Sequence, residues 1–325
     1  MISFNNLIFG LLVITLRIEA MIMSIFQIKK QIDSIKKTMQ ITNAMRLVST
    51  SKYNKMVQEA KYYEQYSYMV RRLVYQIISP NVGAFSQVPF GGNGSLSSID
   101  YHDMLVERPV NKTGYLVITS DKGLSGDYNS SLIKKFDKYI QQHHESFDEI
   151  EVLAIGEPIA KYCRENKIHI AFENHTISDY PTFTEVQKII QKAIELYNNK
   201  TYDALVVVYN HSENIMMTSL RLDPLLPLKE IGFDDMDDEP IDYLIEPSVE
   251  DVLDELLIKF VESQIYGAII DAKTTEQASR MQAMNQATDN AEELIQKLQR
   301  EYNQQRQLKI TNEILDIING SMAQQ

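Results

Sequence analysis

The sequence predicts a mixed α/β fold in which long helices at the two ends of the chain form an antiparallel coiled coil that encloses an inserted α/β domain. Three observations lead to this prediction. The stretch from Ser248 to Ala323 contains no proline and repeats apolar residues in a seven-residue frame. Residues 25–77 repeat apolar residues in the same frame. The segment between them alternates short apolar runs with helical stretches, as in a mostly parallel sheet.

The C-terminal frame places mostly apolar residues, such as Leu253, Phe260, Ile295 and Leu298, at its a and d positions. A seam two positions wide per heptad suits one partner helix, whereas a globular core requires a broader apolar stripe. The N-terminal helix offers a matching seam from Ile25 to Ile77. We therefore expect the two ends of the chain to pair with each other.

The register of this pairing follows if both helices leave the inserted domain at one level, at Ile78 and Pro247. Met23 then lies opposite a residue near Tyr302. The C-terminal frame also stops there, because beyond Gln305 the apolar residues move to other positions: Leu308, Ile310, Ile314, Leu315, Ile317, Ile318 and Met322. About 20 residues, roughly 30 Å of helix, therefore have no partner within the chain. An apolar tip of this kind requires a sleeve formed by other chains.

The inserted domain is expected at residues 113–246, after a linker at 79–112 that is rich in glycine, proline and serine. Strands are predicted at 115–119, 151–155, 168–172, 204–208 and 215–222, and helices at 128–142, 157–166 and 184–198. Strands separated by helices of this length form right-handed crossover units, so we expect a Rossmann-like domain with a mostly parallel sheet. The C-terminal helix then occupies residues 247–325.

Residues 1–22 precede the seven-residue frame and contain an apolar run from Leu7 to Leu16. This run is too short to span a membrane, which requires about 20 residues. No basic residue precedes it and no clear small-residue cleavage site follows, as an export signal would require. We therefore expect an extension from an upstream start codon, with the working chain beginning at Met21 or Met23 and the N-terminal helix occupying residues 23–78.

The charge of the chain limits its partners. A net charge of −12 and a pI near 5.1 argue against general nucleic acid binding. Basic residues nevertheless outnumber acidic ones in the N-terminal helix. This helix has either a solvated basic face or a basic surface for acidic partners. Cys163 is the single cysteine, so a disulfide within the chain is excluded.

Few residue patterns in the sequence indicate chemistry. Ser120 to Gly126 (SDKGLSG) lies where a phosphate-binding loop would lie, between the first strand and helix of the domain. It lacks the glycine pattern of such loops, which favours a tight turn that needs Gly123 and Gly126 for backbone freedom. The histidines and Cys163 lack metal-ligand spacing, and the acidic run Asp234 to Glu239 favours a solvated loop. We expect no catalytic, cofactor-binding or metal site.

Several stretches resemble the gamma subunits of F-type ATP synthases, in particular the bacterial type. The stretch from Gln27 to Lys52 (QIKKQIDSIKKTMQITNAMRLVSTSK) resembles their opening helix, and the turn from Ser120 to Gly126 is similar to a turn of their central domain. The likeness extends from Met23 to the C-terminus. It is completed by Asp242–Ser248 (DYLIEPS), Val261–Tyr266 (VESQIY), Arg280–Ala291 (RMQAMNQATDNA) and Tyr302–Ile314 (YNQQRQLKITNEI).

The resemblance implies a rotor shaft that couples transmembrane proton flow to ATP synthesis or hydrolysis. Its coiled coil would stand within a hexamer of alternating alpha and beta subunits, with its tip in an apolar bearing. The α/β domain would form a foot that contacts the epsilon subunit and the membrane ring of c subunits. The subunit would be non-catalytic by itself and peripheral to the cytoplasmic face of a bacterial cell membrane.

Carried over position by position, the contacts of the family with beta subunits fall on two sites of the chain. They are Met45 and Arg46 in the first helix, and Arg280, Arg306, Gln307 and Thr311 in the last. Three residues depart from the family pattern: Ser125 stands where cysteine is common, Asn43 where lysine is usual, and Gly267 where a larger residue is frequent. The linker at 79–112 is also longer than in many members.

A second hypothesis is a coiled-coil scaffold whose α/β domain binds a small ligand at the Gly123 turn. It predicts a chain that is soluble without partners. A third, enzymatic hypothesis requires ATP hydrolysis by the isolated chain, for which the sequence offers no site.

Overall fold

The computed structural model describes the backbone of residues 2–78, 104, 108–175, 177–214, 217–228 and 244–322, with side chains described from residue 25 onward except at 78, 249 and 250. Two compact units make up the chain. The paired-helix unit contains residues 1–48 and 283–325, and the sheet unit contains residues 49–282. Most of the predicted linker at 79–112 and the acidic run from Asp234 to Glu239 lie outside the described residues.

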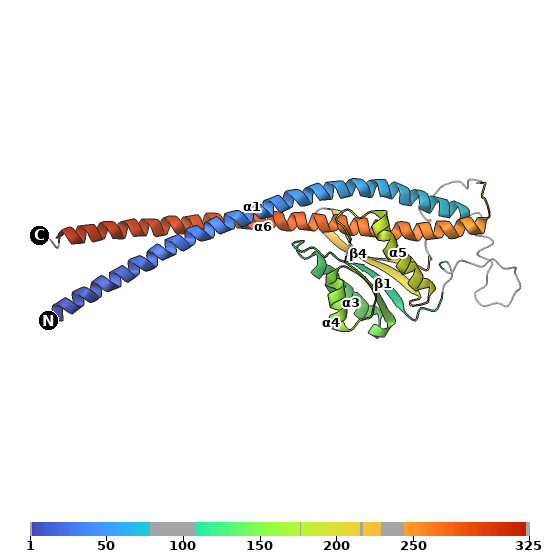
Figure 1. Cartoon of the computed structure of the whole chain (residues 1–325), viewed down its shortest axis with the longest axis horizontal. Coiled ribbons are helices and arrows are strands. Elements are labelled where there is room, and N and C mark those ends of the chain that lie inside the picture. Colours follow the sequence, from blue (N-terminus) through green and yellow to red (C-terminus); the bar gives the residue numbers. More distant parts are fainter. Residues whose placement is uncertain are drawn as a thin grey trace. The chain divides into compact units, whose positions relative to one another are not determined.

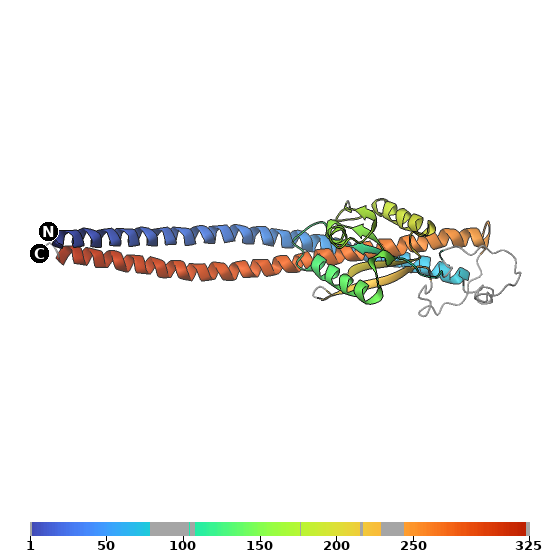
Figure 2. The ribbon, with the colours of Figure 1, turned by 90° about the horizontal axis from the view of Figure 1, so that it is seen from below.

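Two long helices contribute to both units. Helix α1 extends from Ile2 to Ile78 and helix α6 from Val249 to Met322. Helix α1 therefore begins before residue 23, where the N-terminal helix was expected to start. The colours in Figure 2 show that the two helices run in opposite chain directions.

In the paired-helix unit, α1 and α6 pack through the predicted seam. Ile32, Ile295 and Leu298 form a buried apolar cluster, and Ile28, Ile35, Met39 and Tyr302 pack against it. Next to this cluster, the hydroxyl groups of Thr42 and Thr288 lie 2.9 Å apart. The a and d positions are the less exposed ones on both helices, so the frame read from the sequence is confirmed for this unit.

The predicted register of the pair is wrong by about one helical turn. Placing Ile78 level with Pro247 would set Thr42 opposite residue 283, whereas Thr42 meets Thr288, five residues further along α6. The prediction took the ends of the helices as its reference. In the structure, the fit of side chains along the seam decides the register, with isoleucines meeting apolar residues and the two threonines bonding to each other.

The narrow seam does not continue along α6 in the sheet unit. Every residue from Ile265 to Arg280 is buried or half-buried. One side of this segment contributes Ile265, Ala268, Ile269 and Ala272 to the core against the sheet. Other residues face α1, so this part of α6 is covered on nearly all sides. The prediction of a two-position seam is wrong here, because it considered α1 as the single partner.

Gly267 of α6 lies beside the ring of Tyr63 of α1. A Cβ atom added to Gly267 would lie 3.2 Å from Cε1 of Tyr63. The Tyr63 hydroxyl donates to the Ser263 carbonyl at 2.5 Å, and its ring meets the Tyr266 ring edge-on at 4.7 Å. Because these contacts hold the Tyr63 ring in place, glycine is the residue that fits at position 267.

The sheet has five strands in the order β3-β2-β1-β4-β5. Their bounds are Thr113–Ile118 for β1, Ile150–Ile155 for β2, Ile170–Asn174 for β3, Ala204–Asn214 for β4 and Met217–Leu226 for β5. The first four strands pair in parallel, and β5 is an antiparallel edge strand. The mostly parallel sheet predicted from the sequence is therefore confirmed.

Helices cover both faces of this sheet (Figure 1). Helices α3 (Tyr128–His143) and α4 (Glu157–Asn166) pack on one face, against side chains such as Tyr115 and Val117. Helix α5 (Phe183–Asn198) and α6 pack on the other, against Leu116 and Ile118. The alternation along β1 explains its continuous apolar sequence, because both of its faces are buried.

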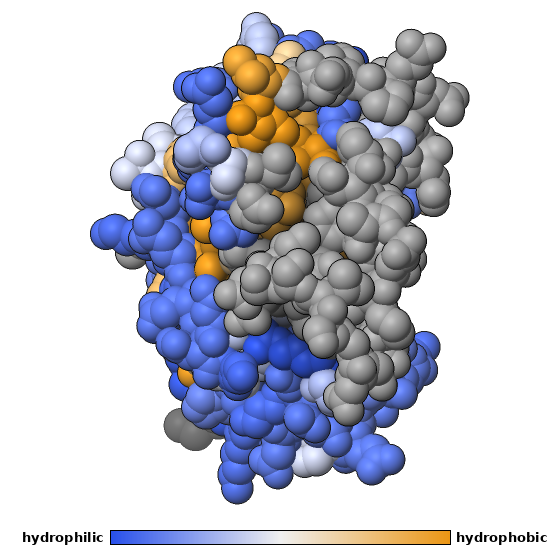
Figure 3. Space-filling view, turned by 90° about the vertical axis from the view of Figure 1, so that its right-hand side faces the viewer, coloured by the Kyte–Doolittle hydropathy of each residue, from blue (hydrophilic) through white to orange (hydrophobic). Residues whose placement is uncertain are grey.

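The core on the α5 face also includes residues of the long helices. Val70, Val74 and Ile77 of α1 join Leu257 and Val261 of α6 in the same cluster as the sheet. Figure 3 looks onto the end of the unit where α1 ends and α6 begins, and it shows a hydrophobic area on the side of the long helices above a hydrophilic lower part. The inserted domain and the two helices therefore share one core.

The seam predicts a measurable difference between two neighbouring residues of α6. Ile295 is 8% exposed and Leu294 is 44% exposed. Ile295→Ala should lower the local stability of the pair by about 2 kcal/mol, because it removes buried methyl groups from the cluster. Leu294→Ala is the matched control. Hydrogen exchange of the α6 amides around residue 295 should increase in the first variant alone, and equal exchange in both would contradict the assigned frame.

Candidate functional site at the carboxyl edge of the sheet

The strand order reverses between β1 and β4. The connections from β1 to β2 and from β2 to β3 place α3 and α4 on one face, whereas the connection from β3 to β4 places α5 on the other. In open α/β sheets, the crevice at such a reversal is the usual ligand site. The turn from Ser120 to Gly126 follows β1 directly and lies at this point. It is therefore the first place to look for a bound small molecule.

Side-chain bonds fix the shape of this turn. The Ser120 N–H donates to Asn129 Oδ1 at 2.9 Å, and Asn129 Nδ2 donates to the Ser120 carbonyl at 2.8 Å. Backbone φ angles are positive at Leu124 (64°) and Gly126 (63°). The prediction that the turn needs glycine for its backbone freedom is confirmed at Gly126. It is wrong at Gly123, because the neighbouring residue Leu124 has the left-handed backbone conformation instead.

An arginine from α6 binds the backbone of the turn. Arg280 Nε donates to the Gly123 carbonyl at 3.2 Å and Nη2 donates to the Lys122 carbonyl at 3.1 Å. Nη2 also donates to Glu276 at 2.7 Å, and Lys273 Nζ donates to the other oxygen of Glu276 at 3.1 Å. The three charged residues are between 1% and 6% exposed. Each of these buried charges has a partner of opposite sign, which offsets the cost of removing it from water.

This geometry leaves little room for a phosphate at the turn. A phosphate-binding loop directs several backbone N–H groups toward its ligand. Here the carbonyls of Lys122 and Gly123 point inward and are occupied by Arg280. The arrangement therefore resembles a fastening between the turn and α6 more than a nucleotide site, and it weakens the hypothesis of a ligand at Gly123.

Further bonds join α6 to the sheet and α3. The buried Tyr128 hydroxyl donates to the Ala272 carbonyl at 3.0 Å, and Asn210 Nδ2 at the end of β4 donates to the Tyr128 carbonyl at 2.9 Å. His211 Nδ1 lies 2.5 Å from a carboxylate oxygen of Asp271. Burial raises the pKa of Asp271, while the bond with His211 acts in the opposite direction. These contacts fix α6 against the carboxyl ends of β1 and β4.

The six residues that the family resemblance marks as partner contacts have different surroundings. Arg280 is 6% exposed and bonded within the sheet unit, so it differs from a solvated side chain. The other five lie in the paired-helix unit: Met45 and Arg46 are half-buried, whereas Arg306, Gln307 and Thr311 are exposed. The Thr311 hydroxyl donates to the Gln307 carbonyl at 2.9 Å, one turn earlier on α6. The sequence did not distinguish the inward arginine from the outward residues.

The C-terminal end of α6 exposes the apolar residues expected there. Exposure ranges from 44% to 72% for Leu308, Ile310, Ile314, Leu315, Ile317, Ile318 and Met322. An isolated exposed leucine is ordinary, but seven large apolar side chains within 15 residues of one helix are typical of a surface covered by a partner.

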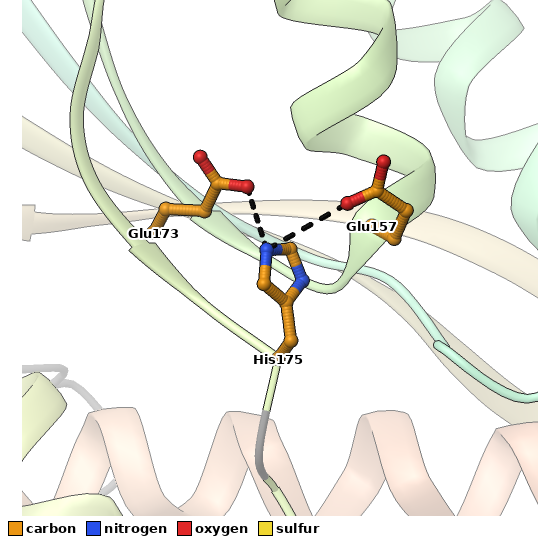
Figure 4. A group of neighbouring side chains, drawn as sticks. All are labelled: Glu157, Glu173 and His175. Atoms are coloured by element: carbon orange, nitrogen blue, oxygen red, sulfur yellow. Dashed lines mark hydrogen bonds and ion pairs between the residues drawn. The ribbon is translucent and has the colours of Figure 1, made fainter.

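One group of metal-ligating residue types was missed in the sequence. Glu157, Glu173 and His175 bring one ligand atom each within 4.8 Å of one another, and all three are exposed (Figure 4). Arg164 donates to both carboxylates, at 2.5 Å to Glu157 and 2.8 Å to Glu173. Since the guanidinium group and His175 already pair with both carboxylates, the group is best described as an exposed ion-pair network. Glu157 begins α4, whereas Glu173 lies in β3 and His175 directly follows this strand, so the full group forms no local motif.

Within the described residues, no helix has both the length and the apolar character that crossing a membrane requires.

Replacing Arg280 should loosen the turn. Arg280→Ala leaves the carbonyls of Lys122 and Gly123 without their donor and removes one partner of Glu276, at a cost of about 3 kcal/mol. Hydrogen exchange at the Leu124 and Ser125 amides should then increase. Arg300→Ala changes an exposed arginine of the same helix and should leave this exchange unaltered. Protection of the turn in Arg280→Ala equal to that of the unchanged chain would contradict its role as a fastening.

Comparisons with known proteins agree with the family resemblance. A family model described as ATP synthase matches residues 24–323. The chain is 42% identical over 300 residues to the ATP synthase gamma chain of Enterococcus faecalis, covering 92% of this chain and 98% of that one. It is also 42% identical over 301 residues to the gamma chain of Streptococcus suis, with the same coverage.

Solved structures share the fold. A chain of the Euglena gracilis mitochondrial ATP synthase, in a structure of OSCP, F1 and c-ring, matches with a TM-score of 0.60 and 16% identity, covering 93% of this chain and 94% of that one. A chain of the Tetrahymena thermophila mitochondrial ATP synthase, in a structure of the central stalk and c-ring, matches with a TM-score of 0.52 and 19% identity. This match covers 76% of this chain and 99% of that one. On the extent and level of these matches, the chain belongs to the family of ATP synthase gamma chains.

Proposed function

We propose that this chain is the central rotor shaft of an F-type ATP synthase and couples transmembrane proton flow to ATP synthesis or hydrolysis. The observation that carries the proposal is the antiparallel pair of α1 and α6, which has an apolar seam inside and an exposed apolar end on α6. Such an end is suited to a bearing formed by surrounding subunits. The structural relatives with this fold include a rotor and a central stalk.

The mechanism follows from a mismatch of symmetry. A single pair of helices cannot make the same contacts with three equivalent catalytic subunits at once. Each subunit therefore meets a different side of the shaft and is stabilised in a different conformation. The orientation of the shaft and the nucleotide affinities of the subunits are then linked, and each can drive the other.

The sheet unit would transmit rotation to the helices. Bonds from Arg280 to the turn after β1 and from Tyr128 to the α6 backbone fasten the sheet to α6. Because the donors Arg280 and Tyr128 are buried, water competes for these bonds less than at the surface. A torque applied to the sheet domain would then reach α6 without local slippage.

We assign the chain a non-catalytic role, with ATP chemistry in its partners. Support comes from the crevice between β1 and β4, where an α/β domain usually binds its ligand. Arg280 and Glu276 of the same chain occupy that position. The catalytic partners are alpha and beta subunits arranged alternately in a hexamer around the paired helices.

Contacts with the hexamer are assigned to Met45, Arg46, Arg306, Gln307 and Thr311, which lie in the paired-helix unit and are half-buried or exposed. We give Arg280 an indirect part, since it holds the turn from within. The epsilon subunit and the c-ring are proposed to bind the sheet unit, where Figure 3 shows a hydrophobic area. The bacterial relatives support a peripheral position on the cytoplasmic face of the cell membrane.

Gln307 provides a test of the contacts with the hexamer. Gln307→Ala should lower ATP turnover or its coupling to proton uptake by up to about fivefold, as expected for one lost hydrogen bond. Subunit stoichiometry should be unchanged, because an exposed side chain contributes little to folding. Gln299→Ala, also exposed on α6, is the control. The complex would be reconstituted in vesicles and both rates recorded. Wild-type values of both rates for Gln307→Ala would remove this residue from the contact set.

A further inference from the structure

Residues 177–183, which comprise the described part of the loop between β3 and α5 and the first residue of α5, reach both long helices of the sheet unit. Asp179 Oδ2 lies 2.7 Å from Lys52 Nζ on α1 and 2.7 Å from Lys122 Nζ in the turn after β1. One carboxylate oxygen therefore joins α1 to the turn that Arg280 fastens to α6. The side chain of Asp179 is 13% exposed and that of Lys52 is 29% exposed.

Neighbouring residues of the loop add contacts to the same two helices. Lys55 of α1 lies over the Tyr180 ring, with Nζ 4.2 Å from the ring centroid. The Tyr266 hydroxyl of α6 donates to the Pro181 carbonyl at 3.0 Å, and the Phe183 ring meets the Tyr266 ring edge-on at 5.8 Å. The loop thus holds each helix by a polar contact and by an aromatic ring.

The loop itself is held in a defined shape. The Ser178 hydroxyl donates to the Tyr180 carbonyl at 2.7 Å and to Glu185 at 2.9 Å. Thr182 and Glu185 form a capping box that fixes the start of α5. Because its end is anchored on a core helix, a force on the loop is passed to the sheet domain.

The charge of Asp179 is maintained at neutral pH. Burial would raise the pKa of its carboxyl group, but the ammonium groups of Lys122 and Lys52 outweigh this effect and lower the pKa to about 2. The carboxylate is therefore ionised and paired with both lysines throughout the physiological range. A partly buried pair of this kind is less screened by water and salt than a surface pair.

We propose that residues 177–183 form a clamp loop that locks α1 and α6 to the sheet domain under torque, and that Asp179 is a positioning residue for coupling. This inference rests on the proposed shaft function. Nearer its C-terminal end, α1 contributes the apolar residues Val70, Val74 and Ile77 to the core of the domain. Apolar contacts are non-directional and permit sliding, whereas an ion pair and a ring contact at fixed positions resist it. Without the clamp, α1 would lose its ion pair with Asp179 and its ring contact with Tyr180, and the connection between α1 and the sheet domain would be weaker when the domain is driven.

The test compares three variants in the complete complex reconstituted in vesicles. Asp179→Asn removes the charge that both lysines share, and Asp179→Glu restores it. Glu195→Gln is the matched control, because Glu195 pairs with Lys192 on the exposed face of α5. For each complex, ATP hydrolysis and proton uptake are measured, with and without an uncoupler that removes the opposing gradient.

Asp179→Asn should assemble with normal stoichiometry and hydrolyse ATP at the wild-type rate when the uncoupler is present. Without it, proton uptake per ATP should fall by about threefold, the size expected of a residue that relays a conformational change. Asp179→Glu should recover most of the loss and Glu195→Gln should show none. A variant that is merely less stable would assemble poorly or hydrolyse ATP more slowly in the presence of the uncoupler. Loss of the clamp is expected to change neither of these.

Two results would overturn the proposals, and they are distinguishable. Proton uptake per ATP in Asp179→Asn equal to that of the wild-type complex would overturn the clamp while leaving the shaft function in place. A wild-type complex that hydrolyses ATP without any proton uptake would overturn the shaft function itself. If Asp179→Asn does not assemble, Lys52→Met replaces it in the same measurements, because it removes the ion pair with α1 and keeps the pair between Asp179 and Lys122. Proton uptake per ATP equal to that of the wild-type complex in Lys52→Met would likewise overturn the clamp.

Discussion

A buried helix constrains everything that packs around it, because bending it would break backbone hydrogen bonds that water cannot replace. In this protein the buried helix is α6, whose residues from Ile265 to Arg280 are all buried or half-buried. The sheet packs on one side of it and α1 on another. The domain therefore cannot rotate about α6 without separating a shared apolar core, which costs about 25 cal/mol for every Å² of apolar surface exposed. A stiff connection between a domain and a helix follows directly from this burial.

Charged groups make the connection specific. A core of apolar side chains alone would hold α6 at many similar angles, since apolar contacts have little directionality. Glu276, Lys273 and Arg280 form a buried charged set on α6. Arg280 also donates to the Gly123 and Lys122 carbonyls, and these two bonds require one position of the helix relative to the turn after β1. Moving α6 relative to the turn would break the bonds from the buried Arg280 guanidinium group to these two carbonyls, and a buried polar group without a partner is more unfavourable than a lost apolar contact. The clamp loop extends the same logic to α1 through Asp179.

Most of the elements could be predicted from periodicity, because each has a simple relation to burial. The apolar runs of β1, β2 and β4 are covered on both faces, and the seven-residue frame of α1 and α6 points toward a single partner helix near Ile32 and Ile295. Features that depend on pairs of residues far apart in the chain could not be predicted. The register, which brings Thr42 to Thr288, depends on the fit of side chains across two helices.

The candidate site was predicted in part, for the same reason. The turn after β1 was located by its place between a strand and a helix, but its occupant Arg280 comes from a helix 157 residues later in the chain. An arginine on a long helix is usually solvated, and only the crossing of α6 over the carboxyl ends of the strands turns this one inward. The clamp loop shows no motif, because Asp179 and its two lysines lie on three separate elements.

The most direct measurement is rotation itself. The alpha and beta hexamer would be fixed to a surface with this chain inside it, and a bead attached to the sheet unit would be followed during ATP hydrolysis. The account predicts rotation in one direction with pauses at three angular positions, one for each catalytic subunit. Hydrolysis at a normal rate with a bead that shows only random angular motion would contradict the assignment of this chain as the shaft.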